Sequence, residues 1–290
     1  MQRVIKKFSM FLKETLIINY WWVIMESDDK MFKYIDEVFI DKQNKEVYIY
    51  MSPKMLYAPD HIATHGIPKY TDISQHKPII VDTKEATFIK GPLRVGSGVL
   101  LIINNNLIPL QLRDEHVRYY KKMFNDFSGH VGAGETIMDT AMKEFYEEVL
   151  FIDIENKCPI FLTNDRLYTY DMSVYKTSAQ VAKESYKLDI NSDNIIVLPS
   201  QFIQDEDIYT IIVYDNRRKV NEFKGMIMYD KDTNSLEVTI LISAELDVNK
   251  ITILSLETIG TPVVLFTKEN LKNVKFSFLT PRVREIRKIL

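Results

Sequence analysis

The sequence is poor in cysteine and in long hydrophobic runs, and both shortages exclude classes of protein. Cys158 is the one cysteine in 290 residues, so no intrachain disulfide can form, and a reducing cytoplasm fits this composition. An apolar run over residues 16–25 is too short to span a bilayer. Lys13 and Glu14 also interrupt what would be the apolar core of a signal peptide. We therefore expect a cytoplasmic protein that does not enter a membrane.

Net charge is also small. The chain has 37 Lys and Arg residues against 40 Asp and Glu, a formal charge of −3. This balance gives no general attraction to nucleic acid or to anionic lipid, although it leaves room for a small basic groove. A hydrophobic fraction of 46% supports a real core, and the length suits one large domain or two smaller ones.

Glycine is scarce, and its distribution is uneven. Three of the nine glycines, Gly129, Gly132 and Gly134, fall within one short segment. Such a turn permits positive φ and lets a ligand approach the backbone closely. Backbone N–H groups here, together with the start of a helix, could also bind an anion. Taken alone, the segment also fits an ordinary turn between a strand and a helix.

A helix is predicted directly after this turn. Thr136 followed by Asp139 is typical of a capped helix start. Apolar residues then recur every four positions and predict one buried stripe: Ile137, Ala141, Phe145 and Val149. Glu144, Glu147 and Glu148 fall within an arc of about 100° that borders this stripe, so they should face a cleft. Three such carboxylates repel one another by roughly 0.2–0.5 kcal/mol per pair, which a bound divalent cation would reverse. A solvated acidic face is the alternative reading.

The spacing of these residues matches a known pattern. Gly129 is followed after five residues by Glu135, and after seven more by Lys143-Glu144-Phe145-Tyr146-Glu147-Glu148. Residues 129–151 thereby resemble the Nudix box, whose pattern ends Arg-Glu, aliphatic, any residue, Glu-Glu, any residue, Gly, aliphatic. Two positions depart from it, because Lys143 replaces arginine and Leu150 replaces glycine. Lysine keeps the charge but not the planar fork, and neither change removes a carboxylate.

The resemblance implies a role for each matching position. Glu144, Glu147 and Glu148 align with the carboxylates that bind metal and carry catalysis. Glu135 aligns with the loop glutamate that organises the metal site, and the carbonyl of Ser128 with a further metal contact. Gly129, Gly132, Gly134 and Lys143 would shape the loop around the bound nucleotide. The implied cofactor is Mg²⁺ or Mn²⁺, which lowers the pKa of an attacking water.

The resemblance also implies a fold and a reaction. The fold would be an α/β/α sandwich with a mixed sheet, and the reaction would be hydrolysis of a nucleoside diphosphate linked to another group. Many members add a carboxylate near the C-terminal end as ligand or general base. Glu257 is the candidate here, with Glu245 and Asp247 as rivals.

The pattern outside the box predicts the remaining elements. A β-hairpin is expected from the apolar runs 95–103 and 107–112, which flank three consecutive asparagines. Further segments are expected as strands: 38–41, 46–51, 157–162, 194–198, 208–214, 225–229, 236–242 and 262–266. A helix is expected over 173–186. We assign residues 1–90 to a mostly β N-terminal extension or small domain, and 91–290 to the Nudix-like domain with an insertion near 170–220.

Two other functions stay open. Lys143 and Leu150 would also suit a nucleotide-sensing module that binds without cleaving. Decapping of RNA is a third hypothesis, and a nucleic-acid partner is expected only in that case. The sequence leaves the specific nucleotide and the formation of a homo-oligomer undecided.

Overall fold

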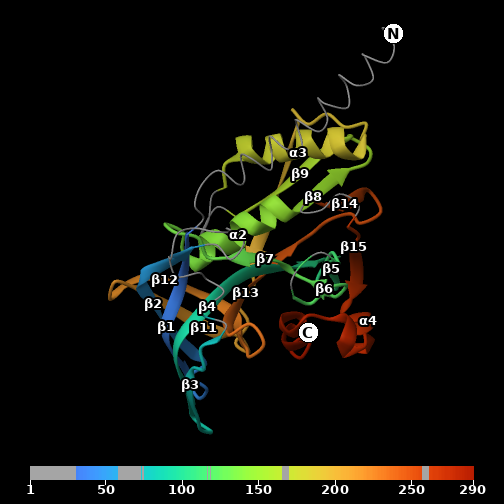
Figure 1. Cartoon of the computed structure of the whole chain (residues 1–290). Coiled ribbons are helices and arrows are strands. Elements are labelled where there is room, and N and C mark those ends of the chain that lie inside the picture. The colour runs from blue at the N-terminus through green and yellow to red at the C-terminus, as the bar shows by residue number, and fades with distance from the viewer. Residues whose placement is uncertain are drawn as a thin grey trace, which may run out of the picture.

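The computed structural model describes residues 31–57, 73, 75–115, 117, 119–164, 170–256 and 261–290, so Glu257 lies outside the described residues. Strands occupy most of this range (Figure 1). They are β1 (Met31–Asp41), β2 (Glu46–Tyr57), β3 (Ile79–Asp82), β4 (Ala86–Ile103), β5 (Leu107–Leu112), β6 (Phe124–Asn125), β7 (Phe127–His130), β8 (Val149–Asp153), β9 (Cys158–Thr163), β10 (Ile196–Phe202), β11 (Tyr209–Asp215), β12 (Arg218–Asp230), β13 (Ser235–Ala244), β14 (Ile251–Ser255) and β15 (Val263–Thr267). The helices are α2 (Ile137–Glu148), α3 (Met172–Tyr186), α4 (Lys268–Asn273) and α5 (Pro281–Ile286), with a 3₁₀ turn η2 (Phe276–Phe278).

The described strands form one connected, mixed sheet. Its main order is β14-β8-β9-β10-β13-β12-β11-β2-β1-β4-β5-β15, with β13 also pairing with β4. The β4–β13, β2–β11 and β9–β10 pairs are parallel. The remaining pairs between these strands are antiparallel. The α/β class and the mixed sheet expected from the sequence are therefore confirmed.

Strand β4 is central because it buries both of its faces. Side chains alternate along a strand, so odd and even positions face opposite sides. The odd side carries Val99 and Leu101 into the main core, where they join the apolar stripe of α2 and the buried side chains of α3. The even side carries Leu100 and Ile102 into a second cluster with residues of α4 and α5. Helices therefore cover both faces of the sheet around β4 (Figure 1).

Helix α2 begins as predicted. Thr136 Oγ1 accepts a hydrogen bond from Asp139 N at 3.1 Å, and the Asp139 carboxylate accepts from Thr136 N at 3.0 Å. The helix ends at Glu148, because Val149 adopts extended backbone and starts β8. Leu150 is fully buried in that strand. A direct entry into a strand thus replaces the left-handed turn that a glycine at this position would favour.

Several other elements were also predicted correctly. The β4–β5 hairpin turns at Asn104 and Asn105, whose φ angles of 50° and 55° lie in the left-handed region that asparagine tolerates. The helix expected over 173–186 is α3. Strands β8 and β14 and the C-terminal helix α5 were not anticipated.

The domain boundary expected after residue 90 falls within a continuous strand. Residue 90 lies inside β4, and β1 and β2 belong to the same sheet as the strands after it. The described part of residues 1–90 is mostly β, as expected. Its role as a separate unit stays a prediction. No helix in the described ranges is both long and apolar enough to cross a bilayer.

Candidate functional site

The glycine loop lies against the acidic edge of α2. Strand β7 pairs with β4, so that Ser128 lies opposite Gly98, and Gly129 lies opposite Ser97. A Cβ atom at position 129 would lie 2.2 Å from both Cδ and Oε1 of Glu144. The absence of a side chain at Gly129 therefore lets the Glu144 carboxylate approach the loop backbone.

Glu148 is held in place on the same edge of the helix. Its Oε2 accepts hydrogen bonds from Ser128 N at 2.7 Å and from Gln111 Nε2 at 3.0 Å. Gln111 is oriented in turn by Ser255, whose hydroxyl donates to its Oε1 at 3.3 Å. Glu148 is 7% exposed, so these two donors compensate for much of the water that its carboxylate loses. The loop and the last turn of α2 are thus joined through one carboxylate.

Glu135 faces its own loop. Its carboxylate accepts from Lys143 Nζ at 2.8 Å, Thr140 Oγ1 at 2.7 Å and Gly132 N at 3.2 Å. Burial alone would raise the pKa of Glu135, but the hydrogen bonds from Lys143 and Thr140 outweigh it, and the pKa is lowered. Lys143 thus supplies an ion pair at the position where the box has an arginine. Gly134, with φ of 81°, supplies the left-handed turn of this loop.

Glu147 has a different partner from the other two helix carboxylates. Its Oε1 accepts from Tyr170 Oη at 3.3 Å, toward the start of α3. The structure therefore brings Glu144 and Glu148 together with Ser128 and Gly129, whereas Glu147, Glu135 and Lys143 do not line the same pocket. The rival carboxylates Glu245 and Asp247 are exposed in the loop after β13 and do not line it either.

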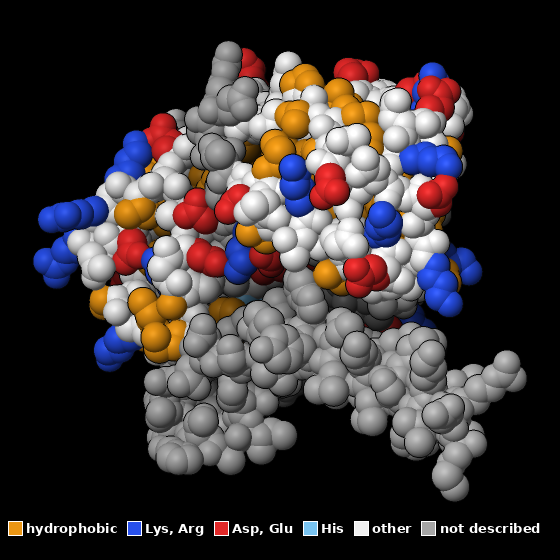
Figure 2. All heavy atoms as spheres, turned by 90° about the horizontal axis from the view of Figure 1, so that it is seen from above, with side chains coloured by type: hydrophobic (Ala, Val, Ile, Leu, Met, Phe, Trp, Pro, Cys, Tyr) orange, Lys and Arg blue, Asp and Glu red, His pale blue; other side chains and the backbone are white. Residues whose placement is uncertain are grey.

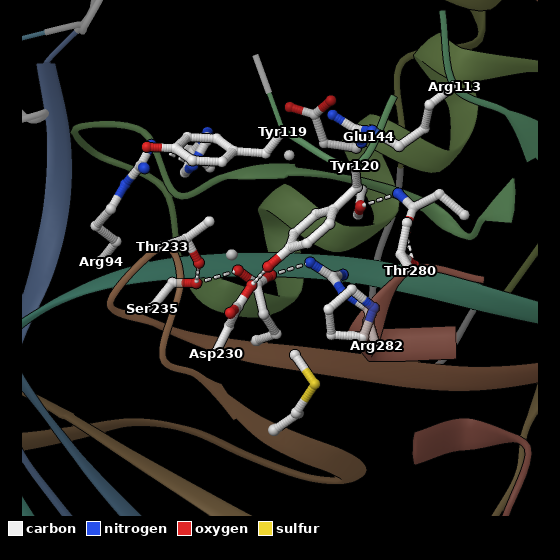
Figure 3. A pocket seen from close by; sticks show the side chains of 18 of the residues that line it. Arg94, Arg113, Tyr119, Tyr120, Glu144, Asp230, Thr233, Ser235, Thr280 and Arg282 are labelled. Atoms are coloured by element: carbon white, nitrogen blue, oxygen red, sulfur yellow. Dashed lines mark hydrogen bonds and ion pairs between the residues drawn. The ribbon is translucent and has the colours of Figure 1, made fainter. Parts of the chain in front are cut away.

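A pocket of about 620 Å³ opens beside these carboxylates (Figure 3). Its walls come from elements that are far apart in the sequence. The residues that line it include Phe32, Arg94, Arg113, Tyr119, Tyr120, Ser128, Gly129, His130, Glu144, Glu148, Asp230, Ser235, Glu237, Thr280 and Arg282. This volume lies within the roughly 300–1,000 Å³ usual for small-molecule sites.

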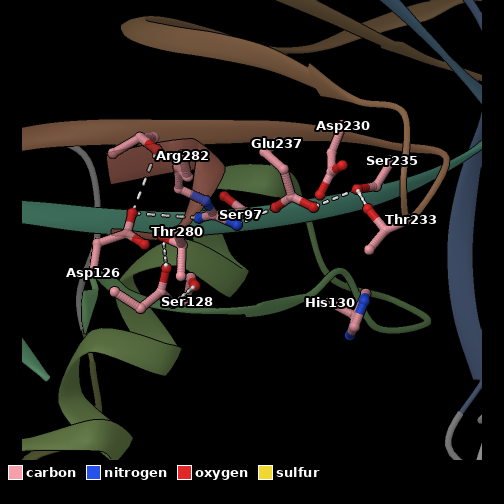
Figure 4. A network of polar contacts seen from close by, with 12 residues as sticks. Ser97, Asp126, Ser128, His130, Asp230, Thr233, Ser235, Glu237, Thr280 and Arg282 are labelled. Carbon is pink, nitrogen blue, oxygen red and sulfur yellow. Dashed lines mark hydrogen bonds and ion pairs between the residues drawn. The ribbon is translucent and has the colours of Figure 1, made fainter. Parts of the chain in front are cut away.

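A buried ionic network forms one wall of the pocket (Figure 4). The Arg282 guanidinium forms ion pairs with Asp126 Oδ2 at 3.4 Å and with Glu237 Oε2. Gly96 and Gly98 of β4 make space for it, since a Cβ at either position would lie within 3.1 Å of a guanidinium nitrogen. Two strand glycines thus permit a cation to cross the face of β4.

Burial sets the protonation of this wall. It raises the pKa of Asp126 to about 6, although the charge of Arg282 opposes the rise. Burial would also raise the pKa of Glu237, but Arg282 and the Ser235 hydroxyl outweigh it, and the pKa is lowered. His130 is desolvated beside the Arg94 charge, which together lower its pKa to about 4. At neutral pH the wall thus holds ionised carboxylates beside a neutral imidazole.

The C-terminal segment reaches the loop through hydrogen bonds. Thr280 Oγ1 donates to Asn125 Oδ1 at 2.8 Å, and Asn125 Nδ2 donates to Ser128 Oγ at 3.2 Å. No site residue after Glu257 was predicted from the sequence. Two local signals were present: Pro281, which suits the first turn of a helix, and the glycines of β4, which indicate a close approach.

The residues present fit a divalent metal only in part. In the described ranges, no three His, Cys, Asp or Glu side chains gather closely enough to hold a metal ion by themselves. Mg²⁺, however, usually keeps several waters and takes one or two carboxylates together with substrate phosphates. Glu144 and Glu148 supply two hard oxygen donors at one pocket, which matches that smaller requirement.

Comparisons with known proteins give a loose likeness in fold. No family model and no curated protein matches the sequence. The chain is similar to a Nudix-family hydrolase from Clostridium perfringens, with 12% identity over 67% of this chain and 93% of that one, at a TM-score of 0.33. It is also similar to a bifunctional NMN adenylyltransferase/ADP ribose pyrophosphatase from Francisella tularensis, solved with AMP and a manganese ion. That match has 14% identity and a TM-score of 0.35 over 69% of this chain, which spans only 41% of the other protein.

A Nudix hydrolase from M. smegmatis is a third similar structure, with 10% identity over 68% of this chain and 88% of that one, at a TM-score of 0.30. TM-scores and identities at this level carry no argument about activity.

Proposed function

We propose that this chain is a Mg²⁺- or Mn²⁺-dependent Nudix-type hydrolase that cleaves the phosphoanhydride of a nucleoside diphosphate linked to another group. The observation that carries the proposal is the meeting of two helix carboxylates, Glu144 and Glu148, with the glycine loop at one pocket. The match of residues 129–148 to the box spacing, apart from Lys143, agrees with it. The pocket volume of about 620 Å³ suits a nucleotide.

Each residue of the site has a physical task under this proposal. Glu144 and Glu148 would hold the metal, which polarises a phosphoryl oxygen and lowers the pKa of water when bound. Glu148 cannot swing freely, because Ser128 N and Gln111 hold its Oε2. Gly129 leaves the space that Glu144 occupies. Glu135 and Lys143 stabilise the loop that carries these groups. Glu257 stays our candidate for the general base.

The test is hydrolysis of a substrate panel with Mg²⁺ or Mn²⁺, with products identified by mass spectrometry. The panel contains ADP-ribose, NADH, dinucleoside polyphosphates, nucleoside triphosphates and capped RNA. Loss of an outer-shell partner of a metal ligand typically lowers affinity or activity 10–100-fold, so Glu144→Gln should lower kcat by more than about 100-fold. Glu206→Gln, a change in an exposed loop, is the matched control and should keep parent turnover. Parent turnover in Glu144→Gln would show that the metal assignment is wrong.

A second function has its own support. Glu148 already accepts two hydrogen bonds, Glu135 is paired with Lys143, and no three-residue metal group is present in the described part of the chain. These contacts would suit a module that binds a nucleotide without cleaving it. Calorimetry that shows tight binding of a panel member, with no product formed in the presence of metal, would select this function.

Capped RNA stays in the panel as the third hypothesis. On the face shown in Figure 2, acidic and basic side chains are interspersed. The pocket wall likewise combines Arg94, Arg113 and Arg282 with four carboxylates, those of Glu144, Glu148, Asp230 and Glu237. This balance favours a small nucleotide over a polyanionic strand, whose binding depends on an excess of cations.

A further inference from the structure

Arg113 differs from the other cations that line the pocket. Its backbone is fixed just after β5, where Arg113 N donates to Met123 O at 2.9 Å and Lys122 N donates to Arg113 O at 3.1 Å. Its side chain lines the pocket, as does that of Glu144 (Figure 3). Its Nε is buried and has no hydrogen-bond partner. Among the described residues, no hydrogen bond or ion pair reaches this guanidinium.

The other two arginines of the pocket already have partners. Arg282 is paired with Asp126 and Glu237. Nη2 of Arg94 lies 3.1 Å from His130 Nε2, so this guanidinium has a partner although its Nε, like that of Arg113, is buried without a hydrogen bond. A buried guanidinium donor without an acceptor is costly for the protein alone, because that donor has given up water without a replacement. An acceptor that arrives with a ligand would restore the missing hydrogen bonds.

The chemistry of the group indicates which acceptor this is. A guanidinium presents its donors in a planar fork that matches two oxygens of one phosphate. Phe32 and Tyr119 line the same pocket and offer flat apolar surface for an aromatic base. Glu144 lines the same pocket as Arg113 (Figure 3), so a phosphate bound by the fork would share that pocket with the carboxylates to which we assign the metal.

We propose that Arg113 is a substrate-binding residue that takes a phosphate oxyanion of the nucleoside diphosphate moiety. This inference rests on the proposed function, since it names the part of the same substrate that the pocket recognises. It adds a position that lies upstream of residues 129–151 and outside their pattern. It also assigns a role to the segment after β5.

The test measures binding with a probe that cannot be cleaved. α,β-Methylene-ADP is titrated by calorimetry into the parent protein, with and without Mg²⁺, and adenosine is titrated as the probe without phosphate. The same titrations are run on Arg113→Ala, Arg113→Lys and the control Arg218→Ala, which removes an exposed arginine of β12. Melting temperatures establish that each variant is folded, which we expect of Arg113→Ala because it removes no hydrogen bond.

Because Arg113→Ala loses the hydrogen bonds between the guanidinium and the phosphate, we expect it to bind α,β-methylene-ADP about 10- to 100-fold more weakly than the parent. Arg113→Lys should recover part of this loss, because it keeps the charge without the fork. Adenosine binding should be the same in all variants. Equal affinity of the parent and Arg113→Ala for α,β-methylene-ADP would overturn the inference, as would an equal loss for adenosine.

These outcomes separate the inference from the proposed function. Hydrolysis with an unchanged KM in Arg113→Ala would leave the enzyme assignment standing and remove the role of Arg113. Binding that depends on Arg113, in a protein that cleaves no panel member, would keep the site and remove the enzyme. Glu144→Gln gives the converse check, because it should lose turnover while its binding of the analogue still depends on Arg113.

Discussion

Gly129→Ala gives a sharp test of how the loop and α2 cooperate. The new Cβ would lie 2.2 Å from Cδ and Oε1 of Glu144 and 2.7 Å from its Oε2. Comfortable contact between such atoms requires about 3.5 Å, so the carboxylate must retreat by about 1 Å or more. The atoms that must move are the far end of a flexible side chain, and no backbone atom is among them.

This geometry predicts a small change in stability and a large change in function. Moving Glu144 off its preferred rotamer costs about 0.5–1.5 kcal/mol. The lower chain entropy of alanine in the unfolded state offsets about 0.4–1 kcal/mol of that, since Gly129 does not adopt positive φ. The net change in the free energy of unfolding is therefore about 1 kcal/mol or less. A misplacement of 1 Å at a reacting centre can lower turnover by about 100-fold.

Gly134→Ala is the matched control, because its effects should be reversed. At φ of 81° alanine is strained by about 1–2 kcal/mol, whereas no atom lies within 4 Å of the added Cβ. Urea unfolding should therefore show a loss of stability, and steady-state hydrolysis at a temperature where the protein is folded should stay close to that of the parent. Parent-like turnover in Gly129→Ala, or an equal loss of turnover in Gly134→Ala, would refute the reasoning.

Three further changes test the fold around the site by chemical denaturation. Thr136→Ala removes the acceptor for Asp139 N and should lower the free energy of unfolding by about 1 kcal/mol, whereas Thr136→Ser should stay near the parent. Arg282→Met leaves Asp126 and Glu237 without their cation and should cost about 3–5 kcal/mol, against less than about 0.5 kcal/mol for the surface control Lys288→Met. Burial raises the pKa of Asp126 from 3.8 to about 6, so its favourable contribution is present below about pH 3.8 and is lost as the pH rises through 6. The free energy of unfolding of the parent should therefore fall by about 3 kcal/mol across this window, whereas that of Asp126→Asn should not show this fall. Equal pH profiles for variant and parent would contradict the burial of a charged carboxylate.

Local signals in the sequence were enough to predict the elements that carry Glu144 and Glu148. The capping pair Thr136 and Asp139, the four-residue apolar stripe and the asparagine turn at residues 104–106 each involve neighbours in the chain. Such patterns depend on backbone conformations that a few adjacent residues decide. Helix α2 and the turn of the hairpin were accordingly predicted where they are observed, although β4 begins at Ala86 and not at residue 95.

Which glutamates of α2 line the pocket was predicted less accurately. Helical geometry places Glu144, Glu147 and Glu148 within one arc, yet only Glu144 and Glu148 line the pocket. Tyr170 binds Glu147, and Lys143 binds Glu135. The partners of Glu147 and Glu135 depend on packing between α2, the loop and the start of α3. Residue spacing along one helix does not describe this packing.

The opposite wall of the pocket depends on contacts between distant parts of the chain. Arg282 reaches Asp126, which is 156 residues away in the sequence, and Glu237, which is 45 residues away. No local pattern links these three residues, because Asp126 lies between β6 and β7, Glu237 in β13 and Arg282 in α5. Only Gly96 and Gly98 indicated that something would approach β4 closely, without indicating what it was.

Binding of Mn²⁺ tests the central claim most directly. Calorimetric titration of Mn²⁺ into the parent should give a saturable site, and the double variant Glu144→Gln, Glu148→Gln should lose it, while Glu206→Gln keeps it. Added α,β-methylene-ADP should strengthen the parent's site, because substrate phosphates complete the coordination of such ions. Equal Mn²⁺ binding by the parent and the double variant, with or without the analogue, would contradict the claim that these two carboxylates hold the metal.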